Sequence, residues 1–470
     1  MNTKALRQKI LDLAIHGKLV PQDPNDEPAS VLLERIKAEK ERLIKEGKIK
    51  RTKRSKAACD KPHYPYELPK GWCWTTIEDV CSKIGSGSTP KGSNYSKEGI
   101  PFFRSQNVQN FGIVLSDIKY ISEEVHQSMK GTEVIANDLL LNITGGSLGR
   151  CAVVPISFKI GNVSQHVCIL RTVLVKPEYL HCFILSSFFA KSMKITGSGR
   201  EGLPKYNLEK MLFPLPPIHE QERIIIEVKQ LLNYIDKLDT CRVNLIELVS
   251  HAKSKVLDLA IHGKLVPQNS SDEPASELLK RINPKAEITC DNPQYGKLPN
   301  GWCEVQLGDV FNHNTGKALN ASNTEGSMKR YLTTSNVYWN AFDFTTVKQM
   351  YYKDSELDKC SITKGDLLVC EGGDVGRAAI WNFNYDICIQ NHLHRLRPKL
   401  GDLCVSLYYY VFYYLKVNNM IGGKGIGLLG LSSNALHKLH VPLPPINEQH
   451  RIVAKIEELF TQLDKIEASL

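Results

Sequence analysis

Apolar residues recur every three or four positions through the middle of the chain. From Ile224 to Leu259 the steps alternate between four and three, and Arg242 is the one polar residue in the series. This spacing is typical of a coiled-coil seam and predicts one long helix from about Glu220 to Ile261. At 1.5 Å per residue the helix would be about 60 Å long. The residues expected in the seam, including those near the C-terminus, are Ile224, Val228, Leu231, Ile235, Leu238, Ile452, Ile456, Leu459, Leu463 and Ile466.

The same stepping appears at both ends of the chain, from Ile452 to Leu470 and from Leu6 to Leu13. When the C-terminal series is aligned on the central helix, Leu470 matches Arg242, and the N-terminal series matches positions that begin a few residues after Arg242. The two ends therefore form a second copy of the central helix. We expect the two long helices to pair antiparallel around a pseudo-twofold axis, with one helix continuous and the other split between the termini.

The chain contains two copies of one unit. The sequence LDLAIHGKLVPQ occurs unchanged at 11–22 and 257–268, and LP-x-GWC follows at 68–73 and 298–303. Each copy closes with PLPPI-x-EQ-x-RI, at 214–224 and 442–452. A run of twelve identical residues, with the other motifs in the same order, establishes an internal repeat.

Between these motifs, short apolar runs such as Cys168–Leu170 are bounded by Gly, Asn and Pro and predict strands, whereas Tyr179–Ala190 and Leu403–Leu415 predict helices. Each half therefore holds one mixed α/β domain, and the fold class is α/β. The expected organisation is an N-terminal helical region with a basic linker at 1–61, the first α/β domain at 62–215, a central region with the long helix at 216–294, the second α/β domain at 295–443 and a C-terminal helix at 444–470.

The charge of the chain is compatible with a polyanionic partner. Sixty Lys and Arg residues against fifty Asp and Glu give a formal net charge of +10, which suits nucleic acid but also occurs on ordinary soluble enzymes. Seven basic residues gather between Lys48 and Lys61. This segment is either a solvated linker or an arm that contacts phosphates.

Secretion and membrane insertion are not expected. None of the thirteen cysteines forms a CxxC pair, and most lie in apolar surroundings, which indicates reduced structural thiols. The N-terminal residues carry charges where a signal peptide needs an apolar run, and no apolar run approaches about eighteen residues. We expect a cytoplasmic protein that does not interact with membranes.

Motifs of known catalytic chemistry are missing from the sequence. It has no phosphate-binding G-x4-GK-[ST] loop, no HExxH, no GxSxG and no His/Cys cluster with metal-ligand spacing. GxGxxG occurs at 197–202 and at 425–430, but the strand, helix and acidic residue of a dinucleotide site do not accompany it. These glycines predict a turn, or a loop that approaches a phosphate beside Arg200 and Lys424.

The two copies of PLPPI-x-EQ-x-RI entering a coiled coil, together with LP-x-GW and LDLAIHGKLVPQ, resemble the specificity subunit of type I restriction-modification systems. The resemblance covers essentially the whole chain. It implies that 62–215 and 295–443 are target recognition domains, each reading one half of a split, asymmetric DNA sequence. It also implies that the helices set the length of the spacer, the DNA between the two half-sites that the protein does not read.

In that family, two modification subunits dock on the helical regions and bring S-adenosylmethionine, and restriction subunits bring ATP- and Mg²⁺-dependent translocation and cleavage. The resemblance thus implies a non-catalytic chain that binds double-stranded DNA but no cofactor or metal of its own. Two other classes stay open. A self-contained DNA methyltransferase or nuclease with degenerate motifs would act on DNA without added subunits. A coiled-coil interaction adaptor would show no salt-sensitive DNA binding.

Within this resemblance, residues shared by the two halves should serve as scaffold or contact the DNA backbone, and residues that differ in the same frame should read bases. Arginine suits guanine and glutamine suits adenine. An ordinary loop residue is the alternative at every position. The candidate base-reading residues are Arg104, Ser105, Gln106, Gln109, Thr333, Thr334, Ser335 and Tyr338. The candidate backbone or scaffold residues are Asn107, Arg150, His166, Arg200, Asn336, Arg377, His392 and Lys424.

Overall fold

The computed structural model of the chain describes residues 2–49, 64–90, 92, 95–195, 202–286, 291–292, 296–319, 324–421 and 431–470. The basic segment predicted between Lys48 and Lys61 lies almost entirely outside these residues. The chain divides into two compact units, which we call unit 1 (Met1–Cys241) and unit 2 (Arg242–Leu470). The division falls inside one continuous helix of 44 residues, α8 (Ile218–Ile261), which confirms the predicted long helix.

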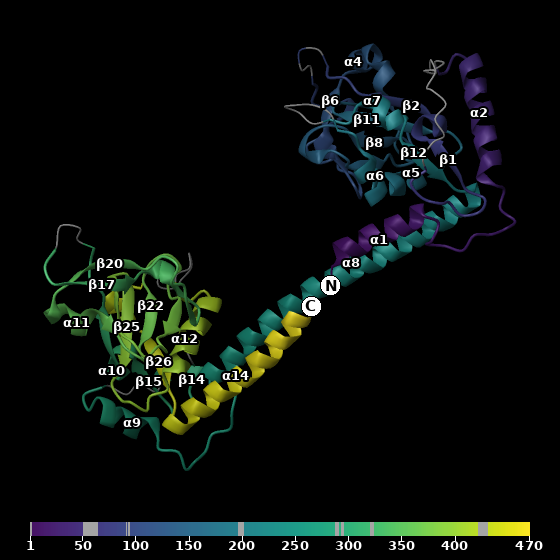
Figure 1. The fold of residues 1–470 in the computed structure, drawn as a ribbon. Coiled ribbons are helices and arrows are strands. Elements are labelled where there is room, and N and C mark those ends of the chain that lie inside the picture. Colours follow the sequence, from purple (N-terminus) through teal and green to yellow (C-terminus); the bar gives the residue numbers. More distant parts are fainter. Residues whose placement is uncertain are drawn as a thin grey trace. The chain divides into compact units, whose positions relative to one another are not determined.

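In unit 1, the N-terminal helix α1 (Thr3–Ile15) lies antiparallel along the first half of α8 (Figure 1). Near the start of α1, Arg7 forms ion pairs with Asp236 at 2.7 Å and with Asp239 at 3.0 Å. Near its end, Ile15 is buried in the same hydrophobic cluster as Ile224. Because residue numbers rise along α1 while they fall along α8, this pairing confirms the predicted antiparallel arrangement.

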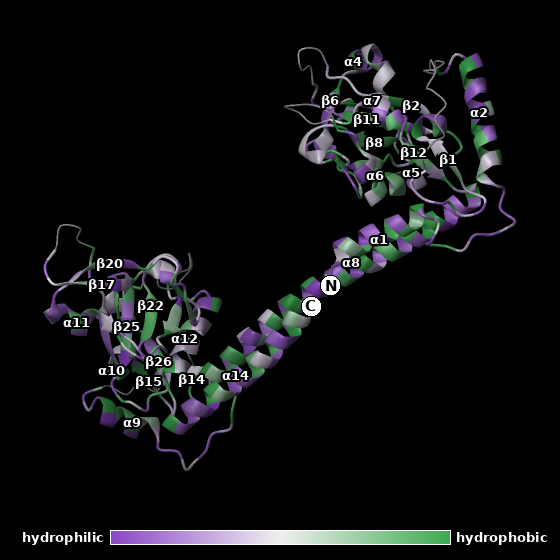
Figure 2. Cartoon of the chain, viewed as in Figure 1, coloured by the Kyte–Doolittle hydropathy of each residue, from purple (hydrophilic) through white to green (hydrophobic). Residues whose placement is uncertain are grey.

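Unit 2 repeats this pairing with the C-terminal helix α14 (Ile446–Ser469), which lies along the second half of α8 (Figure 1). Lys253 forms ion pairs with Asp464 at 2.7 Å and Glu467 at 3.0 Å. Closer to the domain, Ile452 is buried in one cluster with Ile261. Figure 2 shows hydrophobic and hydrophilic residues alternating along these helices, as an amphipathic pairing requires.

The predicted seam is buried only over part of its length. Ile224, Val228, Ile235, Ile452 and Ile456 are buried, and Leu231, Leu459 and Leu463 are half-buried. The expectation of burial is wrong for Leu238 and Ile466, which are 48% and 43% exposed. Leu238 lies between Asp236 and Asp239, the two α8 residues that pair with Arg7, and Ile466 lies near the end of α14.

Each α/β unit contains two four-stranded sheets. In unit 1 the first sheet has the order β2-β11-β8-β9, and the second has the order β6-β3-β10-β7 with β3 and β10 parallel. A short pair, β1 with β12, joins the beginning of the domain to its end. The strands are β1 (Cys73–Thr76), β2 (Cys81–Ser86), β3 (Ile100–Phe103), β4 (Val108–Gln109), β5 (Gly112–Ile113), β6 (Lys119–Ile121), β7 (Glu133–Val134), β8 (Leu139–Asn142), β9 (Cys151–Val153), β10 (Gly161–Val163), β11 (Val167–Thr172) and β12 (Leu212–Leu215).

Unit 2 has the same topology, with sheets ordered β16-β25-β22-β23 and β20-β17-β24-β21 and with β15 paired to β26. The predicted mixed α/β domains are therefore present twice. The strands are β13 (Asp291–Asn292), β14 (Gly296–Lys297), β15 (Cys303–Gln306), β16 (Phe311–Thr315), β17 (Ser327–Leu332), β18 (Val337–Tyr338), β19 (Ala341–Phe342), β20 (Lys348–Tyr352), β21 (Ser361–Ile362), β22 (Leu367–Cys370), β23 (Ala378–Ile380), β24 (Ile387–Ile389), β25 (Leu393–Pro398) and β26 (His440–Leu443).

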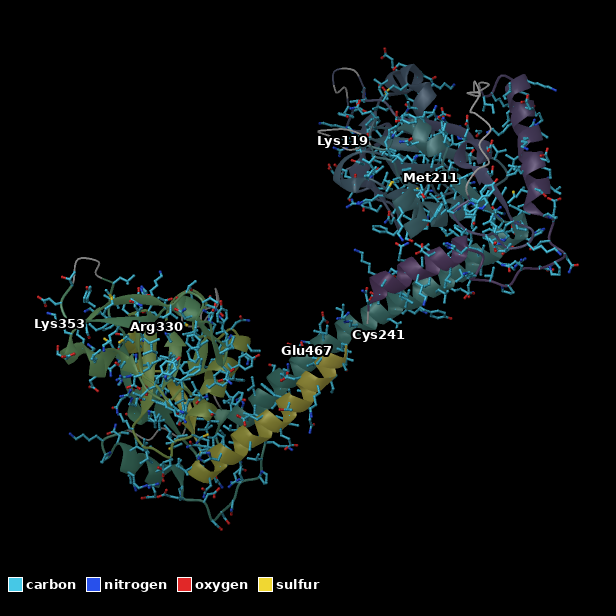
Figure 3. All side chains as sticks on the ribbon, in the orientation of Figure 1. Lys119, Met211, Cys241, Arg330, Lys353 and Glu467 are labelled. Atoms are coloured by element: carbon cyan, nitrogen blue, oxygen red, sulfur yellow. The ribbon has the colours of Figure 1, made fainter. Side chains whose placement is uncertain are left out.

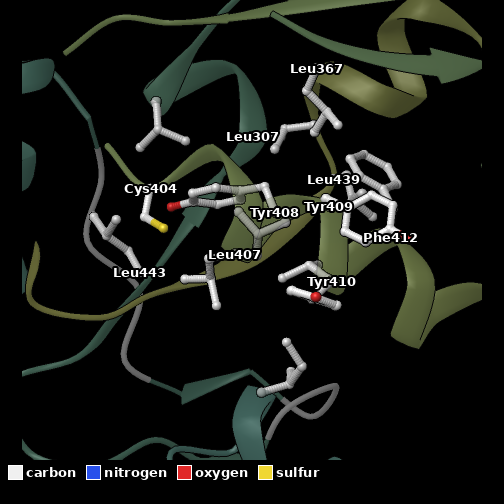
Figure 4. Packing of buried hydrophobic residues seen from close by; sticks show 14 of the residues in the cluster. Leu307, Leu367, Cys404, Leu407, Tyr408, Tyr409, Tyr410, Phe412, Leu439 and Leu443 are labelled. Carbon is white, nitrogen blue, oxygen red and sulfur yellow. The ribbon is translucent and has the colours of Figure 1, made fainter. Parts of the chain in front are cut away.

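The central sheet of each unit is buried on both faces. In unit 1, Leu139 and Leu141 of β8 pack into the cluster that contains the helices, whereas Leu140 packs into a second cluster against the other sheet. This alternation follows from the two-residue period of a strand. Figure 4 shows the helix side of the corresponding core in unit 2, where Tyr408 of α12 lies among leucines that include Leu307 and Leu443.

The remaining helices cover the sheets. They are α2 (Ala29–Lys45), α3 (Ile77–Val80), α4 (Glu123–Ser128), α5 (Pro177–Ile184), α6 (Ser187–Ser192) and α7 (Lys205–Glu209) in unit 1, and α9 (Ala275–Ile282), α10 (Leu307–Val310), α11 (Asp354–Cys360), α12 (Val405–Val417) and α13 (Ser433–His437) in unit 2. The single helix predicted over Tyr179–Ala190 is wrong. The chain breaks into α5 and α6 because Ser186 leaves the helical conformation and caps α6, accepting a hydrogen bond from the Phe189 N–H at 3.2 Å. Among the described residues, no helix has the length and apolar character needed to cross a bilayer.

The repeated motifs meet at one joint in each unit, where α8 begins in unit 1 and α14 begins in unit 2. In unit 1, the carboxylate of Glu220 is buried and accepts hydrogen bonds from Gln22 at 3.1 Å and from Trp72 Nε1 at 2.9 Å. Burial raises the pKa of Glu220. Nearby, Arg223 pairs with Asp26 at 2.6 Å. Three separate motifs of the sequence are thereby joined in space.

The joint of unit 2 uses the equivalent residues. Gln268 donates to Glu448 at 3.1 Å, and Arg451 pairs with Asp272 at 2.6 Å. Gln449 accepts a hydrogen bond from the backbone N–H of Cys404 at 3.1 Å, which holds the start of α12 to α14. The identity of the two motif copies therefore has a structural explanation in the joint between helix and domain.

Gly17, in the LDLAIHGKLVPQ motif, is required at this joint for two reasons. Its φ of +64° lies in the left-handed region, and a Cβ there would overlap the ring of Pro69. Gly47 has a similar φ of +70° but open space around it. We expect Gly47→Ala to lower the free energy of unfolding of unit 1 by about 1 kcal/mol through backbone strain alone. Gly17→Ala should lower it by about 2–4 kcal/mol because overpacking adds to the strain.

Urea titrations of the two variants, followed by circular dichroism, measure this difference. Equal losses of stability in Gly17→Ala and Gly47→Ala would show that contact with Pro69 does not constrain the joint.

Candidate nucleic-acid interface

Three loops that are distant in sequence lie together at one end of unit 1. They are the turn Ser105–Asn107 after β3, the glycine-rich loop Gly145–Arg150 after β8, and the segment around His166 before β11. Asn142 donates to the backbone oxygen of Ser105 at 2.8 Å, and the Ile143 N–H donates to that of His166 at 3.0 Å. We call this group of loops the recognition face of unit 1.

Unit 2 has the equivalent recognition face. Arg377, at the end of the second glycine-rich loop, donates to the backbone oxygen of Thr334 at 2.6 Å. The Glu371 N–H donates to the backbone oxygen of His392 at 3.0 Å. The structure thus brings together the candidate residues of the turn, the glycine-rich loop and the histidine segment within each unit. Arg200 and Lys424 lie outside the described residues.

The shared asparagines hold the turn itself. Asn107 is buried, accepts a hydrogen bond from the Arg104 N–H at 3.0 Å and donates to Val114 O at 3.0 Å. Asn336 is buried in the same way, with the Thr333 N–H at 2.8 Å and Asp343 O at 2.9 Å. Their amide groups are therefore committed to the backbone of the turn, and the side chains on either side of them are displayed.

In unit 1 the displayed side chains form one connected network. Arg104 donates to the Asp117 carboxylate at 3.1 Å, and Gln106 donates to the same oxygen at 2.7 Å. Gln109 donates to Gln106 O at 3.0 Å. Hydrogen bonds from Gln106 and Arg104 lower the pKa of Asp117, so it carries a full negative charge at neutral pH. The motif comparison did not single out Asp117, because it lies beyond the turn in sequence.

The displayed side chains of unit 2 differ in chemistry. Ser335 is exposed and Tyr338 is 46% exposed, whereas Thr333 is buried and bonds to Asn336 at 2.9 Å. The Thr333 side chain is therefore turned inward, away from a surface ligand. The Arg377 guanidinium lies over the Tyr338 ring, 4.8 Å from its centroid. Arg377 and Tyr338 thus form one stacked group, although sequence reasoning assigned them to different roles.

The remaining shared candidates differ between the two units. Arg150 is exposed, whereas its counterpart Arg377 is half-buried. His166 is half-buried, with Nδ1 at 2.8 Å from Thr144 Oγ1, and His392 is exposed, with Nδ1 at 3.6 Å from the Glu371 carboxylate. Among the described residues, no group of three or more His, Cys, Asp or Glu side chains could hold a metal ion.

Sequence reasoning missed an exposed basic hairpin in unit 2. Strands β17 and β20 pair antiparallel, and Lys329, Arg330 and Lys348 on them are exposed without an ion pair to any described residue. Figure 3 labels Arg330 on this hairpin, which leads directly into the Thr333–Asn336 turn. The run Ser327–Leu332 carries two adjacent basic residues, but only the strand pairing places Lys348 beside them.

A histidine pair lies behind the recognition face of unit 2, with His394 buried and His313 half-buried. His313 Nε2 is 3.0 Å from His394 Nδ1, and His394 Nε2 is 2.7 Å from Leu431 O. The matching strand positions of unit 1 hold Ile84 and Cys168. Burial, together with the neighbouring His394, lowers the pKa of His313 to about 4, and burial also lowers the pKa of His394. The folded state therefore binds protons at this pair less readily than the unfolded chain does.

We expect unit 2 to lose stability as the pH falls from about 6.5 towards 4. Over that range the unfolded chain binds protons at these histidines more readily than the folded chain does. Replacing the pair by that of unit 1, His313→Ile with His394→Cys, should reduce the loss. Urea midpoints measured between pH 4.5 and 7.5 test this, with His392→Gln as the exposed control. An unchanged pH dependence in the double variant would contradict the prediction.

Comparison with known proteins gives one consistent result. A family model described as the type I restriction modification DNA specificity domain matches residues 69–248 and 299–470. The chain is similar to the specificity subunit of the type I restriction enzyme EcoAI from Escherichia coli, with 29% identity over 98% of this chain and 90% of that protein. It is also similar to the EcoEI specificity subunit from Escherichia coli, with 26% identity over 99% and 90%.

Among solved structures, the HsdS subunit from Thermoanaerobacter tengcongensis is similar in fold. The TM-score is 0.57 at 20% sequence identity, and the match covers 86% of this chain and 93% of that one.

Proposed function

The chain belongs to the family of type I restriction-modification DNA specificity subunits, and on that premise we propose that the recognition face of each unit reads one half of a bipartite, asymmetric DNA sequence. Members of this family are non-catalytic and carry two target recognition domains. We place the two domains of this chain at 62–215 and 295–443. One observation carries the proposal: a buried asparagine holds the same turn in both units, while the side chains displayed around it differ.

The chemistry of the displayed groups suits a DNA groove. Arg104 and Gln106 offer donors and acceptors that match guanine and adenine edges, and Ser335 and Tyr338 present a different set. Arg150, His166 and His392, together with the basic hairpin of unit 2, are placed to contact phosphates. Phosphate contacts give affinity without sequence preference, so the same fold can serve two different half-sites.

We further propose that the long helix sets the number of base pairs left unread between the half-sites. A helix of 44 residues is about 66 Å long, and its pairing with α1 and with α14 stiffens it. The modification subunits would dock on these helices and supply S-adenosylmethionine. The restriction subunits would supply ATP- and Mg²⁺-dependent cleavage in the cytoplasm. Support for these partners comes from the relatives, which are specificity subunits of type I restriction enzymes.

Exchange of one domain tests the proposal. We expect that replacing residues 62–213 by the recognition domain of a related subunit changes one half of the methylated sequence and leaves the other half and the spacer unchanged. Mapping methylated adenines in cells that express the chimera measures both halves. The reciprocal exchange of residues 295–443 is the control and should change the other half.

An unchanged methylation pattern in both chimeras would overturn the assignment of reading to the two domains. A change of both halves by a single exchange would overturn the assignment of one half-site to each domain.

A further inference from the structure

Asp117 occupies an unusual position beside the reading residues of unit 1. Its φ of 53° lies in the left-handed region, and its side chain is 68% exposed. One carboxylate oxygen accepts hydrogen bonds from Arg104 Nη2 at 3.1 Å and Gln106 Nε2 at 2.7 Å. The same Arg104 nitrogen also donates to the backbone oxygen of Asp117 at 2.8 Å. Two candidate base-reading side chains therefore converge on one acidic residue.

We propose that Asp117 is a positioning residue for base recognition, which holds Arg104 and Gln106 in one preassembled reading group. The inference rests on the proposed function and deepens it, because it states how the first half-site is read. The group would contact base edges in the major groove of double-stranded DNA, where arginine and glutamine find their best partners.

The hydrogen bonds leave the useful atoms of both side chains available. Asp117 uses only Nη2 of Arg104, and Arg104 Nε is buried without a partner among the described residues. Nε is thus shielded from DNA inside the protein, and Nη1, which makes no hydrogen bond to a described residue, remains for an acceptor on DNA. Gln106 donates through Nε2, which leaves its Oε1 to accept a hydrogen bond from a base.

The arrangement contributes orientation more than stability. An ion pair on an exposed carboxylate contributes little to folding. An unrestrained arginine, however, loses rotamer freedom when it binds, and fixing it beforehand reduces that cost. Pairing with Asp117 also offsets the positive charge of Arg104, which weakens the pull of the phosphates on this side chain and favours the base edge.

The repeat supports a role in specificity. Asn107 and Val114 are spaced in the chain as Asn336 and Asp343 are, so the position that matches Asp117 in unit 2 is Thr346. Unit 2 therefore lacks the acidic residue. It orients a different arginine, Arg377, through Thr334 O and the Tyr338 ring. Each unit thus restrains one arginine at the turn, but through different contacts.

Selection from a pool of double-stranded DNA with randomised positions tests the inference. The full-length chain, purified with the subunits that copurify with it, is compared with Asp117→Asn, Arg104→Met and the double variant. Asparagine tolerates a left-handed φ, so the first substitution preserves the backbone. Glu124→Gln is the matched control, because Glu124 is exposed in the same domain and the change in charge is the same.

We expect Asp117→Asn to lower the preference for the selected base at one or two positions of the first half-site by at least about fivefold, the lower limit for one good base contact. The second half-site should stay unchanged, as should both half-sites in Glu124→Gln. Arg104→Met should remove the same preference, and the double variant should lose no more than Arg104→Met alone.

Three results would overturn the inference. In the first, Asp117→Asn selects the same sequences as the control Glu124→Gln. In the second, Asp117→Asn changes the base preference in both half-sites. In the third, Arg104→Met leaves the preference in the first half-site unchanged. The last result decides the question even if Asp117→Asn disturbs the turn. If the unsubstituted complex selects no sequence at all, the proposed function itself fails, and the two failures are therefore distinguishable.

Discussion

A buried carboxylate lies at the start of α8 in unit 1 and of α14 in unit 2, and the position of each α/β domain on its helix depends on the partners of that carboxylate. Glu220 and Glu448 are both 1% exposed. Leaving a buried charged group without partners costs more than the roughly 1–3 kcal/mol of a neutral polar group. Each carboxylate accepts a hydrogen bond from the glutamine that ends the LDLAIHGKLVPQ motif of its own unit. Gln22 donates to Glu220, and Gln268 donates to Glu448. The domain therefore cannot turn on its helix without breaking these bonds.

This constraint separates the part of the protein that stays constant from the part that varies. The joint uses the same residues twice, down to Gly17 and Gly263, which have the same φ of +64°. Away from the joint the two units keep one topology but exchange side chains freely, as the His313–His394 pair in place of Ile84 and Cys168 illustrates. A fixed joint allows the displayed residues to diverge without moving the surface that carries them.

Within the recognition face, the backbone and the side chains have separate tasks. Asn107 and Asn336 satisfy the backbone of the turn from inside the domain, so the neighbouring side chains need not contribute to its stability. They are free to differ, and they do: unit 1 displays an arginine and a glutamine restrained by Asp117, and unit 2 displays an arginine stacked on Tyr338. Substitution of these residues should therefore have little effect on folding.

The sequence by itself determined the repeat, the continuous helix and its split counterpart, because long-range periodicity and identical motifs survive without knowledge of packing. It could not determine that Leu238 and Ile466 are exposed, since a repeated spacing does not show how closely the paired helices pack along their length. Nor could it show that Thr333 turns inward, or that Arg104 and Gln106 converge on Asp117. Those facts depend on side-chain direction and on contacts between segments separated along the chain, and only the tertiary structure decided them.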